Sequence, residues 1–404
     1  MTGVRAPLEP NVKALAAVSL LTDVASEMIY PLLPLFLASV LGASASTIGA
    51  IEGAAESTAS MLKLVSGWWS DRIGRRKPFV LAGYAVAAIA RPFMGLAMSA
   101  SQVMAIRLTD RTGKGIRTSA RDALLADSAE PAARGRAFGF LRAGDNTGAV
   151  VGPLIAWMLL EWGVVPLRRV FLWAAVPGAI GVLVLIVFVR EKRGAGREER
   201  ATHAPAPSVA VDSGSTPLAP FSRAFWLYLF AVLIFTLGNC ADAFLLLRAS
   251  QLGVATALVP ILWAAFSLVK ALCSTPGGAL SDRIGRRPVI IGGWLLFALV
   301  YLLFARARSG WDAWALFGAY GIALGFGEGV EKAFVADLVP TTRRGAAYGW
   351  YNFVLGLGAL PASLVFGLVW DKAGAAAAFT MGASLAGAGA LALLLLVPRE
   401  PSRR

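Results

Sequence analysis

The sequence is poor in the residues on which many enzymes and metal sites depend. Its 404 residues include one histidine, His203, and two cysteines, Cys240 and Cys273. The histidine stands in a polar segment and each cysteine stands in an apolar stretch, so the sequence predicts no disulfide framework and no metal site. A proton relay through histidine inside an apolar segment is excluded for the same reason.

Charged residues are also scarce. They make up 15% of the chain, and 57% of the residues are hydrophobic. Soluble proteins carry about 25% charged residues. A soluble fold of this length could not bury so much apolar surface, which favours a chain that crosses a lipid bilayer several times.

The basic residues do not indicate a nucleic-acid partner, although the net charge is +14. Lysine and arginine stand in short clusters between apolar runs, where such residues orient helices in a membrane. The nucleotide-binding pattern G-x-x-x-x-G-K-[ST] is absent. We therefore expect neither ATP-driven transport nor a bound cofactor.

Twelve runs are long and apolar enough to cross about 30 Å of hydrocarbon. The predicted spans are 14–41, 45–69, 78–99, 101–125, 136–160, 168–190, 224–248, 253–279, 288–307, 312–336, 345–370 and 373–397. The first run is too long for the core of a cleavable signal peptide. The predicted fold class is an all-α membrane protein.

The connections between the spans predict the orientation of the chain. With the N-terminus inside, the inside segments hold 22 of the 38 lysines and arginines, the outside loops hold 6, and the remaining ten lie within spans. Positive residues concentrate on the cytoplasmic side of membrane proteins. We therefore expect a multi-pass protein of a bacterial-type cytoplasmic (inner) membrane, with both termini in the cytoplasm.

The longest connection divides the spans into six and six. It is charged at its start and then rich in proline, alanine and serine, which is typical of a linker with little fixed structure. The predicted organisation is an N-terminal six-helix bundle at 1–190, a cytoplasmic linker at 191–223 and a C-terminal six-helix bundle at 224–404.

Three blocks of sequence occur twice. Residues 70–76 and 281–287 both read SDRIGRR, 211 positions apart. At an offset of 210, ALLAD at 123–127 matches AFVAD at 333–337, and RGRAFG at 134–139 matches RGAAYG at 344–349. Two copies with an even number of spans each are parallel repeats, and transporters of this design bind their solute between the repeats.

The repeated heptapeptide resembles the signature G-x-x-x-D-R-x-G-R-R/K of the major facilitator superfamily. The first copy comprises Gly67, Asp71, Arg72, Gly74, Arg75 and Arg76. The second copy comprises Gly278, Asp282, Arg283, Gly285, Arg286 and Arg287. The resemblance extends over nearly the whole chain, and it implies two pseudo-symmetric six-helix bundles that transport a solute by alternating access.

Two further signatures of this family are met in part. In the fourth span, Arg107 and Gly113 fit the pattern R-x-x-Q-G-x-G, but Asp110 and Arg111 replace its Gln and first Gly. The fifth-span pattern that the family associates with antiporters falls on Gly139, Gly148, Gly152 and Pro153, with Ala156 in place of the last Gly. The resemblance favours an antiporter, although small residues at such intervals also serve plain helix packing.

The heptapeptide has two interpretations. In one, its cations only orient the helices. In the other, which the resemblance implies, Asp71 caps the eleventh span through the helix dipole and the arginines pair with Asp127 at the end of the fourth span. These contacts would form a gate that holds the cytoplasmic side shut and breaks when that side opens.

Ionisable residues within the spans are candidates for function, because a charge in a membrane is costly. The sequence holds ten basic and ten acidic residues of this kind, and such a balance indicates that some of them form structural ion pairs. Without an intramembrane histidine, proton coupling requires carboxyl groups, whose neutral form burial favours. The candidates for proton coupling are Asp23, Glu27, Glu56 and Asp110.

The fourth span carries a basic stripe. Arg107, Arg111, Lys114, Arg117 and Arg121 fall within about 120° of arc on a helix. Since spans 1, 4, 7 and 10 line the central cavity in the family that the chain resembles, the stripe predicts binding of an anionic group, mainly by Arg111 and Lys114. The alternative is that these cations pair with acids of neighbouring spans, which we favour for Arg117 and Arg121.

The remaining cavity candidates lie on several spans. The full set is Tyr30, Arg107, Arg111, Lys114, Asn239, Asp242, Glu328 and Glu331. Glu331 and Lys332 stand at the repeat positions of Arg121 and Asp122, with opposite signs. This relation predicts salt bridges between the halves that form and break with the conformational state.

The sequence as a whole predicts a secondary active transporter, not an enzyme, that moves a small organic solute as a monomer. The first hypothesis is proton-coupled antiport in the direction of efflux. The second is proton-coupled symport that imports an organic anion. A third, of a different class, is a membrane receptor or scaffold that does not transport.

Overall fold

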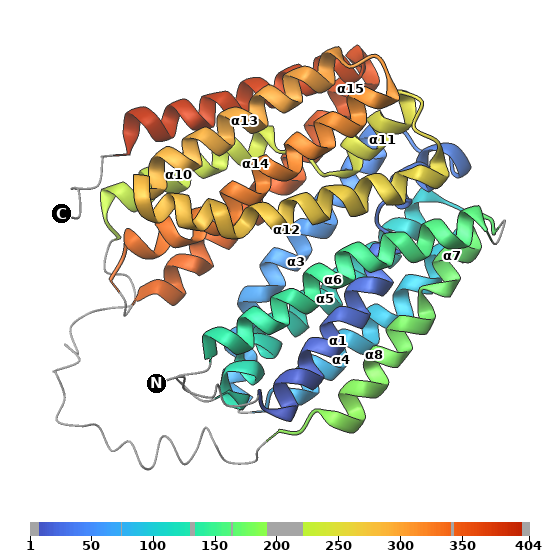
Figure 1. Cartoon of the computed structure of the whole chain (residues 1–404), viewed down its shortest axis with the longest axis vertical. Coiled ribbons are helices and arrows are strands. Elements are labelled where there is room, and N and C mark those ends of the chain that lie inside the picture. Colours follow the sequence, from blue (N-terminus) through green and yellow to red (C-terminus); the bar gives the residue numbers. More distant parts are fainter. Residues whose placement is uncertain are drawn as a thin grey trace, which may run out of the picture.

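The structure is a computed structural model that describes residues 8–73, 75–129, 134–162, 165–191, 221–340 and 343–397. Within these ranges the chain is helical and contains no strand. The helices form two groups that lie side by side, with residue 10 at the start of the first helix and residue 396 at the end of the last on the same side (Figure 1). The predicted all-α fold class is confirmed.

Six spans build the N-terminal half. The first is interrupted and comprises α1, α2 and the π-helix η1, and the third and sixth are also each made of two pieces. The elements are α1 (Pro10–Glu27), α2 (Leu33–Leu35), η1 (Phe36–Val40), α3 (Ala45–Ile73), α4 (Lys77–Ala90), the 3-10 helix η2 (Arg91–Leu96), α5 (Ala100–Ser128), α6 (Arg134–Glu161), α7 (Leu167–Trp173) and α8 (Ala175–Phe188).

Six further spans build the C-terminal half. Its elements are α10 (Arg223–Gly238), α11 (Ala243–Gln251), η4 (Thr256–Leu258), α12 (Val259–Ile284), α13 (Arg286–Arg306), α14 (Gly310–Asp337) and α15 (Arg344–Leu396). The long helix α15 contains two spans, because Gly374 adopts a left-handed φ of 84° that breaks the helical path. Only glycine takes up such a conformation without strain. The predicted linker at 191–223 lies outside the described residues except at its two ends.

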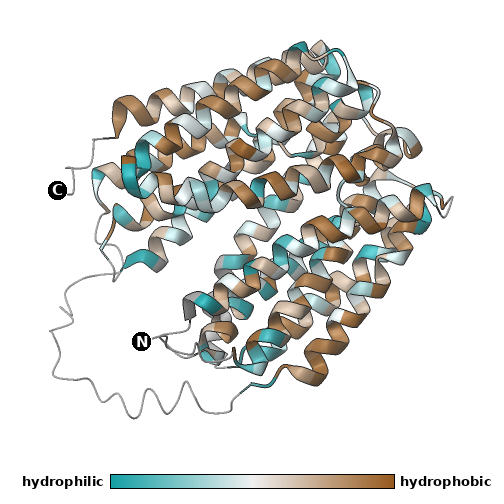
Figure 2. Ribbon diagram, in the orientation of Figure 1, coloured by the Kyte–Doolittle hydropathy of each residue, from teal (hydrophilic) through white to brown (hydrophobic). Residues whose placement is uncertain are grey.

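Six segments are apolar enough to cross a membrane by length and composition. They are Lys77–Leu96, Leu167–Phe188, Arg223–Gln251, Thr256–Ile284, Arg286–Arg306 and Ala346–Leu396. The last segment holds two of the predicted spans. The helices α3, α5, α6 and α14 are 28 or 29 residues long, so their length suffices, but they carry the internal charges. Figure 2 shows the hydrophilic residues on them. The twelve predicted spans thus all correspond to helices, of unequal hydropathy.

The two halves repeat each other in detail. Ser99 caps the N-terminus of α5, and Ser309, at an offset of 210, caps α14. The first span breaks after Glu27, next to Pro31, and the seventh span breaks after Gly238, at an offset of 211. Such interruptions inside a membrane protein are typical of solute and ion sites, because they free backbone groups for binding.

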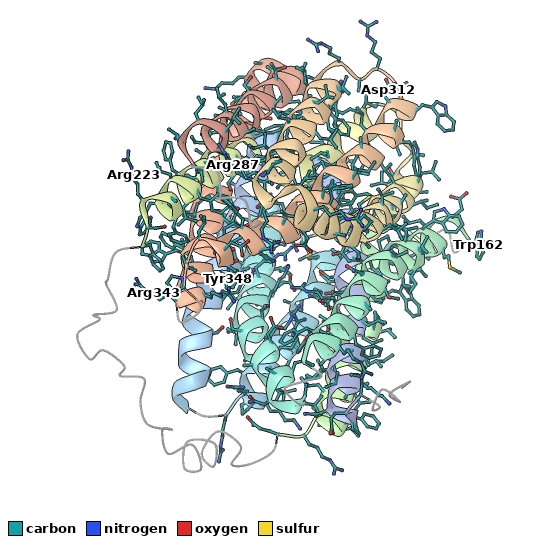
Figure 3. All side chains as sticks on the ribbon, turned by 60° about the vertical axis from the view of Figure 1, so that its left-hand side comes forward. Trp162, Arg223, Arg287, Asp312, Arg343 and Tyr348 are labelled. Carbon is teal, nitrogen blue, oxygen red and sulfur yellow. The ribbon has the colours of Figure 1, made fainter. Side chains whose placement is uncertain are left out.

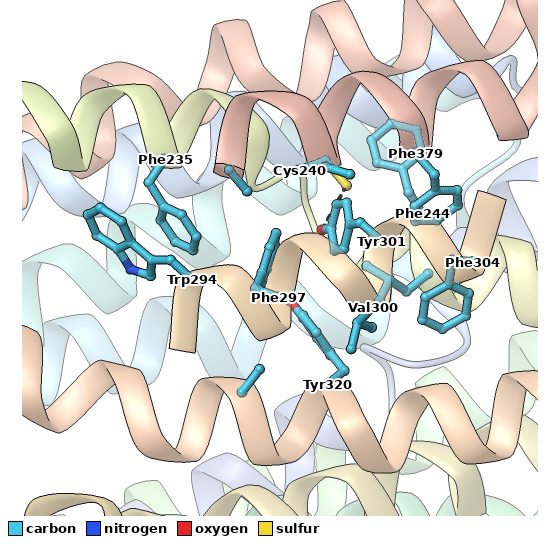
Figure 4. Close-up of a cluster of buried hydrophobic side chains, with 14 of the residues drawn as sticks. Phe235, Cys240, Phe244, Trp294, Phe297, Val300, Tyr301, Phe304, Tyr320 and Phe379 are labelled. Atoms are coloured by element: carbon cyan, nitrogen blue, oxygen red, sulfur yellow. Dashed lines mark hydrogen bonds between the residues drawn. The ribbon is translucent and has the colours of Figure 1, made fainter. Parts of the chain in front are cut away.

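The interiors of the halves differ in chemistry. The C-terminal half is filled by aromatic rings (Figure 4), among which Phe235 stacks on Trp294 with ring centroids 4.4 Å apart. Tyr301 and Cys240 share a hydrogen bond of 3.3 Å in the same cluster. Phe317 and Tyr320 of this half are the repeat counterparts of Arg107 and Asp110, which makes the N-terminal interior ionic where the C-terminal one is aromatic.

The halves meet mainly along two pairs of helices, α3 with α15 and α6 with α12. The Oγ of Ser57 donates a hydrogen bond of 2.6 Å to the carbonyl oxygen of Gly356. A Cβ at Gly49 would lie 2.2 Å from the carbonyl oxygen of Ser363, so α3 and α15 touch through their backbones. We call the end with both heptapeptides the motif end; Arg343 lies there, whereas Trp162 and Asp312 lie at the opposite end (Figure 3).

Candidate functional site

A cavity of about 650 Å³ lies between the two halves. On the N-terminal side it is lined by residues of α1, α3, α5 and α6, and on the C-terminal side by Lys332 of α14 and by Tyr348, Gly349 and Asn352 of α15. It extends from Asp23 toward the motif end, where the start of α15 carries Tyr348 (Figure 3). The cavity therefore occupies the place between the repeats that the sequence predicts for a solute.

The cavity wall carries an excess of positive charge. Its six basic side chains are Lys63, Lys114, Arg117, Arg121, Arg142 and Lys332, and its three carboxylates are Asp23, Asp122 and Asp145. Five of these cations belong to the N-terminal half and one belongs to the C-terminal half. The wall thus has three positive charges more than negative ones.

Asp145 of α6 organises the part of the wall near the motif end. Its carboxylate accepts a hydrogen bond from the hydroxyl of Ser19 and lies 3.7 Å from Nη1 of Arg121 and 3.6 Å from Nη1 of Arg142. Arg121 also contacts Asp122 at 2.9 Å. Arg121 therefore forms ion pairs with carboxylates of its own half, which agrees with the structural alternative favoured for this residue.

A second ionic cluster is buried inside the N-terminal half. Arg107 of α5 donates two hydrogen bonds, of 2.9 and 2.7 Å, to the carboxylate of Glu52 on α3. Asp110 accepts a hydrogen bond of 2.9 Å from Nε of Arg91 and lies 3.5 Å from Arg107. Arg91 also donates to the carbonyl oxygen of Thr22 at 2.9 Å. All four side chains are buried, so they join α1, α3, η2 and α5 into one unit.

This cluster bears on two expectations. Arg107 was expected on the cavity wall and Asp110 was expected to carry a coupling proton; both are engaged in buried ion pairs and neither lines the cavity described above, while a coupling role of Asp110 stays a prediction. A bidentate arginine–carboxylate pair is a strong and directional contact. The alternative interpretation, structural pairing, holds for these two residues because the facing helices supply the matching charges.

Arg111, Lys114 and Arg117 have different surroundings. Lys114 lies on the cavity wall. Arg117 lies on the wall as well, and its guanidinium stacks over the ring of Tyr84 at 4.5 Å. Arg111 is buried, and its Nε has no hydrogen-bond partner among the described residues. The expected acid partner of Arg117 is thus replaced by an aromatic ring.

The carboxyl groups of α1 take two positions. Asp23 lies on the cavity wall. Glu27, one turn away, accepts a hydrogen bond of 2.7 Å from the indole nitrogen of Trp263 on α12, in the opposite half. Tyr30 packs on Trp263 with ring centroids 5.2 Å apart, and Arg107 lies 5.3 Å from the centre of the Tyr30 ring. Glu27 and Tyr30 therefore stand where the two halves touch.

Glu56 of α3 is exposed, although it lies in the middle of a helix that packs inside the molecule. The cations that act on it electrostatically are Lys114, Arg111, Lys63 and Arg107. None of them comes within 4.0 Å of its carboxylate. Glu56 therefore shares the electrostatic surroundings of the basic stripe without being fixed by one partner.

The predicted residues of the C-terminal half form separate contacts. Asp242 accepts a hydrogen bond of 2.6 Å from the hydroxyl of Tyr320, and Asn239 lies beside it in the break between α10 and α11. Glu328 forms an ion pair of 2.7 Å with Lys270. Glu331 accepts hydrogen bonds of 2.8 and 2.7 Å from Trp294 and Tyr351.

Glu331 and Arg121 do not form the predicted salt bridge between the halves. Each is held within its own half, Arg121 by carboxylates and Glu331 by the two ring donors. Lys332, the neighbour of Glu331, faces the cavity instead. The opposite signs at the repeat positions thus mark different local partners in this conformation.

At the motif end each half contains an arginine–carboxylate pair. Arg76 pairs with Asp127, as predicted, and Arg286 pairs with Asp337. The pairs are not equivalent, because Arg286 is the repeat counterpart of Arg75. The helix α13 begins at Arg286 directly after Gly285, whose φ is 91°, whereas α4 begins only at Lys77. Arg287, the counterpart of Arg76, donates instead to the carbonyl oxygen of Leu394.

The other residues of the heptapeptide motifs are less informative. Asp282 lies 3.6 Å from Arg286 in its own turn, and Arg75 and Arg283 are exposed. A Cβ at Gly278 would meet open space. Gly74 and the side-chain surroundings of Gly67, Asp71 and Arg72 lie outside the described residues. The predicted cap by Asp71 on the eleventh span therefore stays a prediction.

The glycines of the fifth span bring α6 onto α1. A Cβ at Gly148 would lie 2.7 Å from the carbonyl oxygen of Leu20 and 2.8 Å from Cβ of Asp23. A Cβ at Gly152 would lie 2.6 Å from the carbonyl oxygen of Val24 and 2.9 Å from Cβ of Glu27. Gly139 faces open space, and Pro153 lies inside α6. Two of the predicted glycines thus hold the helix that carries both candidate coupling carboxylates.

Several residues of the site were not among the predicted candidates. Lys63, Arg117, Arg142 and Lys332 line the cavity, and Trp263 binds Glu27. Each of the four cations is recognisable in the sequence as a charge within a span, but only the fold gives its direction. Trp263 gives no sequence signal that separates it from the other tryptophans of an apolar helix.

The comparison with protein families settles which kind of protein has this architecture. A model described as Major Facilitator Superfamily matches residues 15–261 and 227–404, two overlapping ranges that together cover most of the chain. The chain belongs to the Major Facilitator Superfamily.

Two curated relatives illustrate what the chain is similar to. An uncharacterized MFS-type transporter of Methanocaldococcus jannaschii is 34% identical over 395 residues, which cover 96% of this chain and 95% of the relative. A class G tetracycline resistance protein of Vibrio anguillarum is 25% identical over 353 residues, which cover 84% and 85% of the two chains. As a member of this superfamily, the protein is a multi-pass membrane transporter.

The solved structures agree on the fold. A POT family transporter in complex with 5-aminolevulinic acid superimposes with a TM-score of 0.79, at 13% identity and with 96% of each chain covered. At this identity the likeness concerns the fold alone, and it confirms two six-helix halves.

Proposed function

We propose that this superfamily member is a proton-coupled antiporter that exports a small organic solute by alternating access. The observation that carries the proposal is the pair of carboxyl groups on α1, with Asp23 on the cavity wall and Glu27 at the contact between the halves. The similarity to a tetracycline resistance protein supports the direction of efflux. By its charge pattern we place the protein in a bacterial-type cytoplasmic membrane, with both termini and the motif end inside.

The contact between Glu27 and Trp263 offers a physical link between a proton and the movement of the halves. An ionised carboxylate is a stronger hydrogen-bond acceptor than a neutral carboxyl group. Protonation of Glu27 therefore weakens its bond to Trp263 and loosens α1 from α12. A hydrogen bond to a charged group contributes about 1.5–3 kcal/mol, which is enough to shift a two-state equilibrium roughly tenfold or more.

Asp23 completes this proposal, since it lies one turn from Glu27 and faces the cavity. A proton that enters with the cavity water reaches Asp23 first, and the solute occupies the same space. Competition between proton and solute for one region of the cavity is the simplest basis for antiport. The glycines of α6 hold α1, and with it both carboxyl groups, in close contact with α6.

Proton movement in liposomes tests this function. A thermal-shift screen of small organic compounds first identifies a solute, because binding stabilises the folded state. The purified protein is then reconstituted with a pH-sensitive dye inside the vesicles, and a solute gradient is applied without a pH gradient. Antiport predicts that protons move against the solute; movement in the same direction contradicts it and supports symport.

Symport of an organic anion remains the second candidate function, and the positive excess on the cavity wall favours it. The variants Asp23→Asn and Glu27→Gln distinguish proton coupling from simple exchange. Both are expected to lose transport driven by a proton gradient, while exchange of labelled for unlabelled solute persists. If both retain transport driven by the gradient, the coupling assignment is wrong.

A further inference from the structure

The cations of the cavity wall fall into two groups. Arg121 and Arg142 are paired with the carboxylates of Asp122 and Asp145. In contrast, no carboxylate oxygen of the described residues lies within 4.0 Å of the side-chain nitrogens of the other four, which are Lys63, Lys114, Arg117 and Lys332. Within the described part of the chain, four cations of the cavity wall are therefore unpaired, whereas only one carboxylate of the wall, Asp23, is unpaired.

Arg117 is the most informative of these four cations. It is only 5% exposed, and its Nη1 has no hydrogen-bond partner among the described residues. The ring of Tyr84 covers one face of its guanidinium and leaves the N–H edge without an acceptor. A buried donor without an acceptor is destabilising, so such a group in a native structure calls for an explanation. An acceptor oxygen supplied by a bound solute is such an explanation.

Lys114 and Arg117 both belong to α5, and both line the cavity. Residues three apart on a helix are neighbours on one face. The acids that act on them electrostatically, without direct contact, are Glu56 and Asp23 for Lys114 and Asp110 and Asp23 for Arg117. Asp110 is already paired with Arg91 and Arg107. Glu56 and Asp23 do not balance Lys63, Lys114, Arg111 and Arg117, so this region of the N-terminal half keeps a positive charge.

Lys332 faces this wall from the C-terminal half. The cations that act on it include Arg142 and Lys63, both of the N-terminal half. Closing the cavity at the motif end brings these like charges together, which is unfavourable. A negatively charged solute between the halves would offset this repulsion, whereas a neutral or cationic solute would not.

We propose that the cavity binds an organic anion, whose carboxylate, sulfonate or phosphonate group is held by Lys114 and Arg117 on one side and by Lys332 on the other. The anion satisfies the free N–H edge of Arg117 and neutralises the charges that oppose closure. The proposal rests on the proposed function only in that the cavity is taken as the solute site. It is independent of proton coupling and of the direction of transport.

A panel of probes that share one benzene ring tests the proposal on the full chain in detergent. Benzoate, benzenesulfonate and phenylphosphonate carry one anionic group on a benzene ring, benzamide is neutral and benzylamine is cationic. At constant ionic strength, we expect the midpoint of thermal unfolding to rise with the concentration of at least one anion and not with benzamide or benzylamine. The ranking of the three anions identifies the class of acid group.

Variants then locate the site. Lys114→Gln, Arg117→Gln and Lys332→Gln are each expected to weaken binding of the best anion roughly tenfold, as truncating a charge pair does. Lys332 is exposed, so its variant keeps the proposal testable if Arg117→Gln fails to fold. Lys372→Gln is the control, because it removes one exposed positive charge outside the cavity and should leave the affinity unchanged.

Two results would overturn the proposal. One is an equal response to the anions, to benzamide and to benzylamine, including no response to any of them. The other is anion binding that all three cavity variants retain or that Lys372→Gln reduces equally, since the anion then binds elsewhere. Because no gradient is present in these measurements, failure of the liposome experiment on proton coupling leaves the outcome unaffected.

Discussion

The carboxylate of Asp371 binds the backbone of Ala45 across the boundary between the halves. Its Oδ1 and Oδ2 accept hydrogen bonds of 2.9 Å from the backbone nitrogens of Ala45 and Ser46, which form the N-terminus of α3. An anion at a helix N-terminus is stabilised by the helix dipole. This contact lies at the end opposite the heptapeptides, and it ties the halves together there while the cavity extends toward the motif end.

Loss of this contact should favour separation of the halves at the end opposite the motif end. Asp371→Asn removes the charge, and capping contacts of this kind contribute about 0.5–2 kcal/mol. Spin labels at residues 98 and 311, both exposed, report the distance between the halves by pulsed electron resonance after Cys240 and Cys273 are replaced. We expect a larger population of long distances in the variant.

Asp312→Asn is the matched control for this experiment. Asp312 accepts hydrogen bonds from the backbone of Arg308 and Ser309, but these partners belong to its own half. The control should leave the distance distribution unchanged. An identical shift in both variants would mean that local loosening of a helix end, and not the link between the halves, causes the effect.

The pair of Arg107 and Glu52 should matter for stability more than for solute binding. Removing one partner of a buried ion pair costs about 3–5 kcal/mol, because the other charge stays buried without compensation. We expect Glu52→Gln to lower the midpoint of thermal unfolding strongly, and Glu52→Gln with Arg107→Gln to lower it by less than the sum of the single changes. Additive losses would show that the two side chains act independently.

The close packing of α6 on α1 predicts unequal tolerance of two glycines. Gly148→Ala places a methyl group 2.7 Å from the carbonyl oxygen of Leu20, whereas Gly139→Ala places one in open space. We expect the first variant to lose most transport in liposomes, because α1 and its carboxyl groups are displaced, and the second to transport like the wild type. Equal transport by both variants would show that a displacement of α1 does not impair transport.

The pairs at the motif end predict an unequal effect of the two arginines of one heptapeptide. Arg76 pairs with Asp127, whereas Arg75 is exposed. The variants Arg76→Gln and Asp127→Asn should change the transport rate by a similar factor, and the double variant should add little further change. Arg75→Gln serves as the control and should have a smaller effect. A double variant that multiplies the two single effects would rule out coupling of the pair.

The repeats and the helices follow from the sequence because hydropathy and internal similarity act over long segments. The heptapeptides also predicted the pairing of Arg76 with Asp127. Ion pairs inside the bundle were not predictable in the same way. Helical periodicity gives the face on which Arg107 lies, but the partner on that face, Glu52, stands 55 positions away and depends on how α3 and α5 are rotated.

Local irregularities of the backbone limit how far the contacts of one half predict the contacts at the repeat positions of the other half. The left-handed Gly285 starts α13 at Arg286, so the arginine that meets Asp337 is shifted by one position relative to the first half. Among the described residues Glu331 likewise forms no ion pair, and Trp294 and Tyr351 supply its hydrogen bonds. An alignment of the two repeats cannot show that aromatic hydrogen-bond donors take the place of a cation, since these donors lie on other helices.

The ionic interior of the N-terminal half also has a consequence for biogenesis. Charged residues at the centre of a span cost about 2.5–3.5 kcal/mol each when a helix enters the bilayer alone. Arg107 and Asp110 on α5 therefore depend on Glu52 of α3 and Arg91 of η2, which are synthesised earlier. The fourth span should leave the translocon together with the second and third, as one preassembled unit.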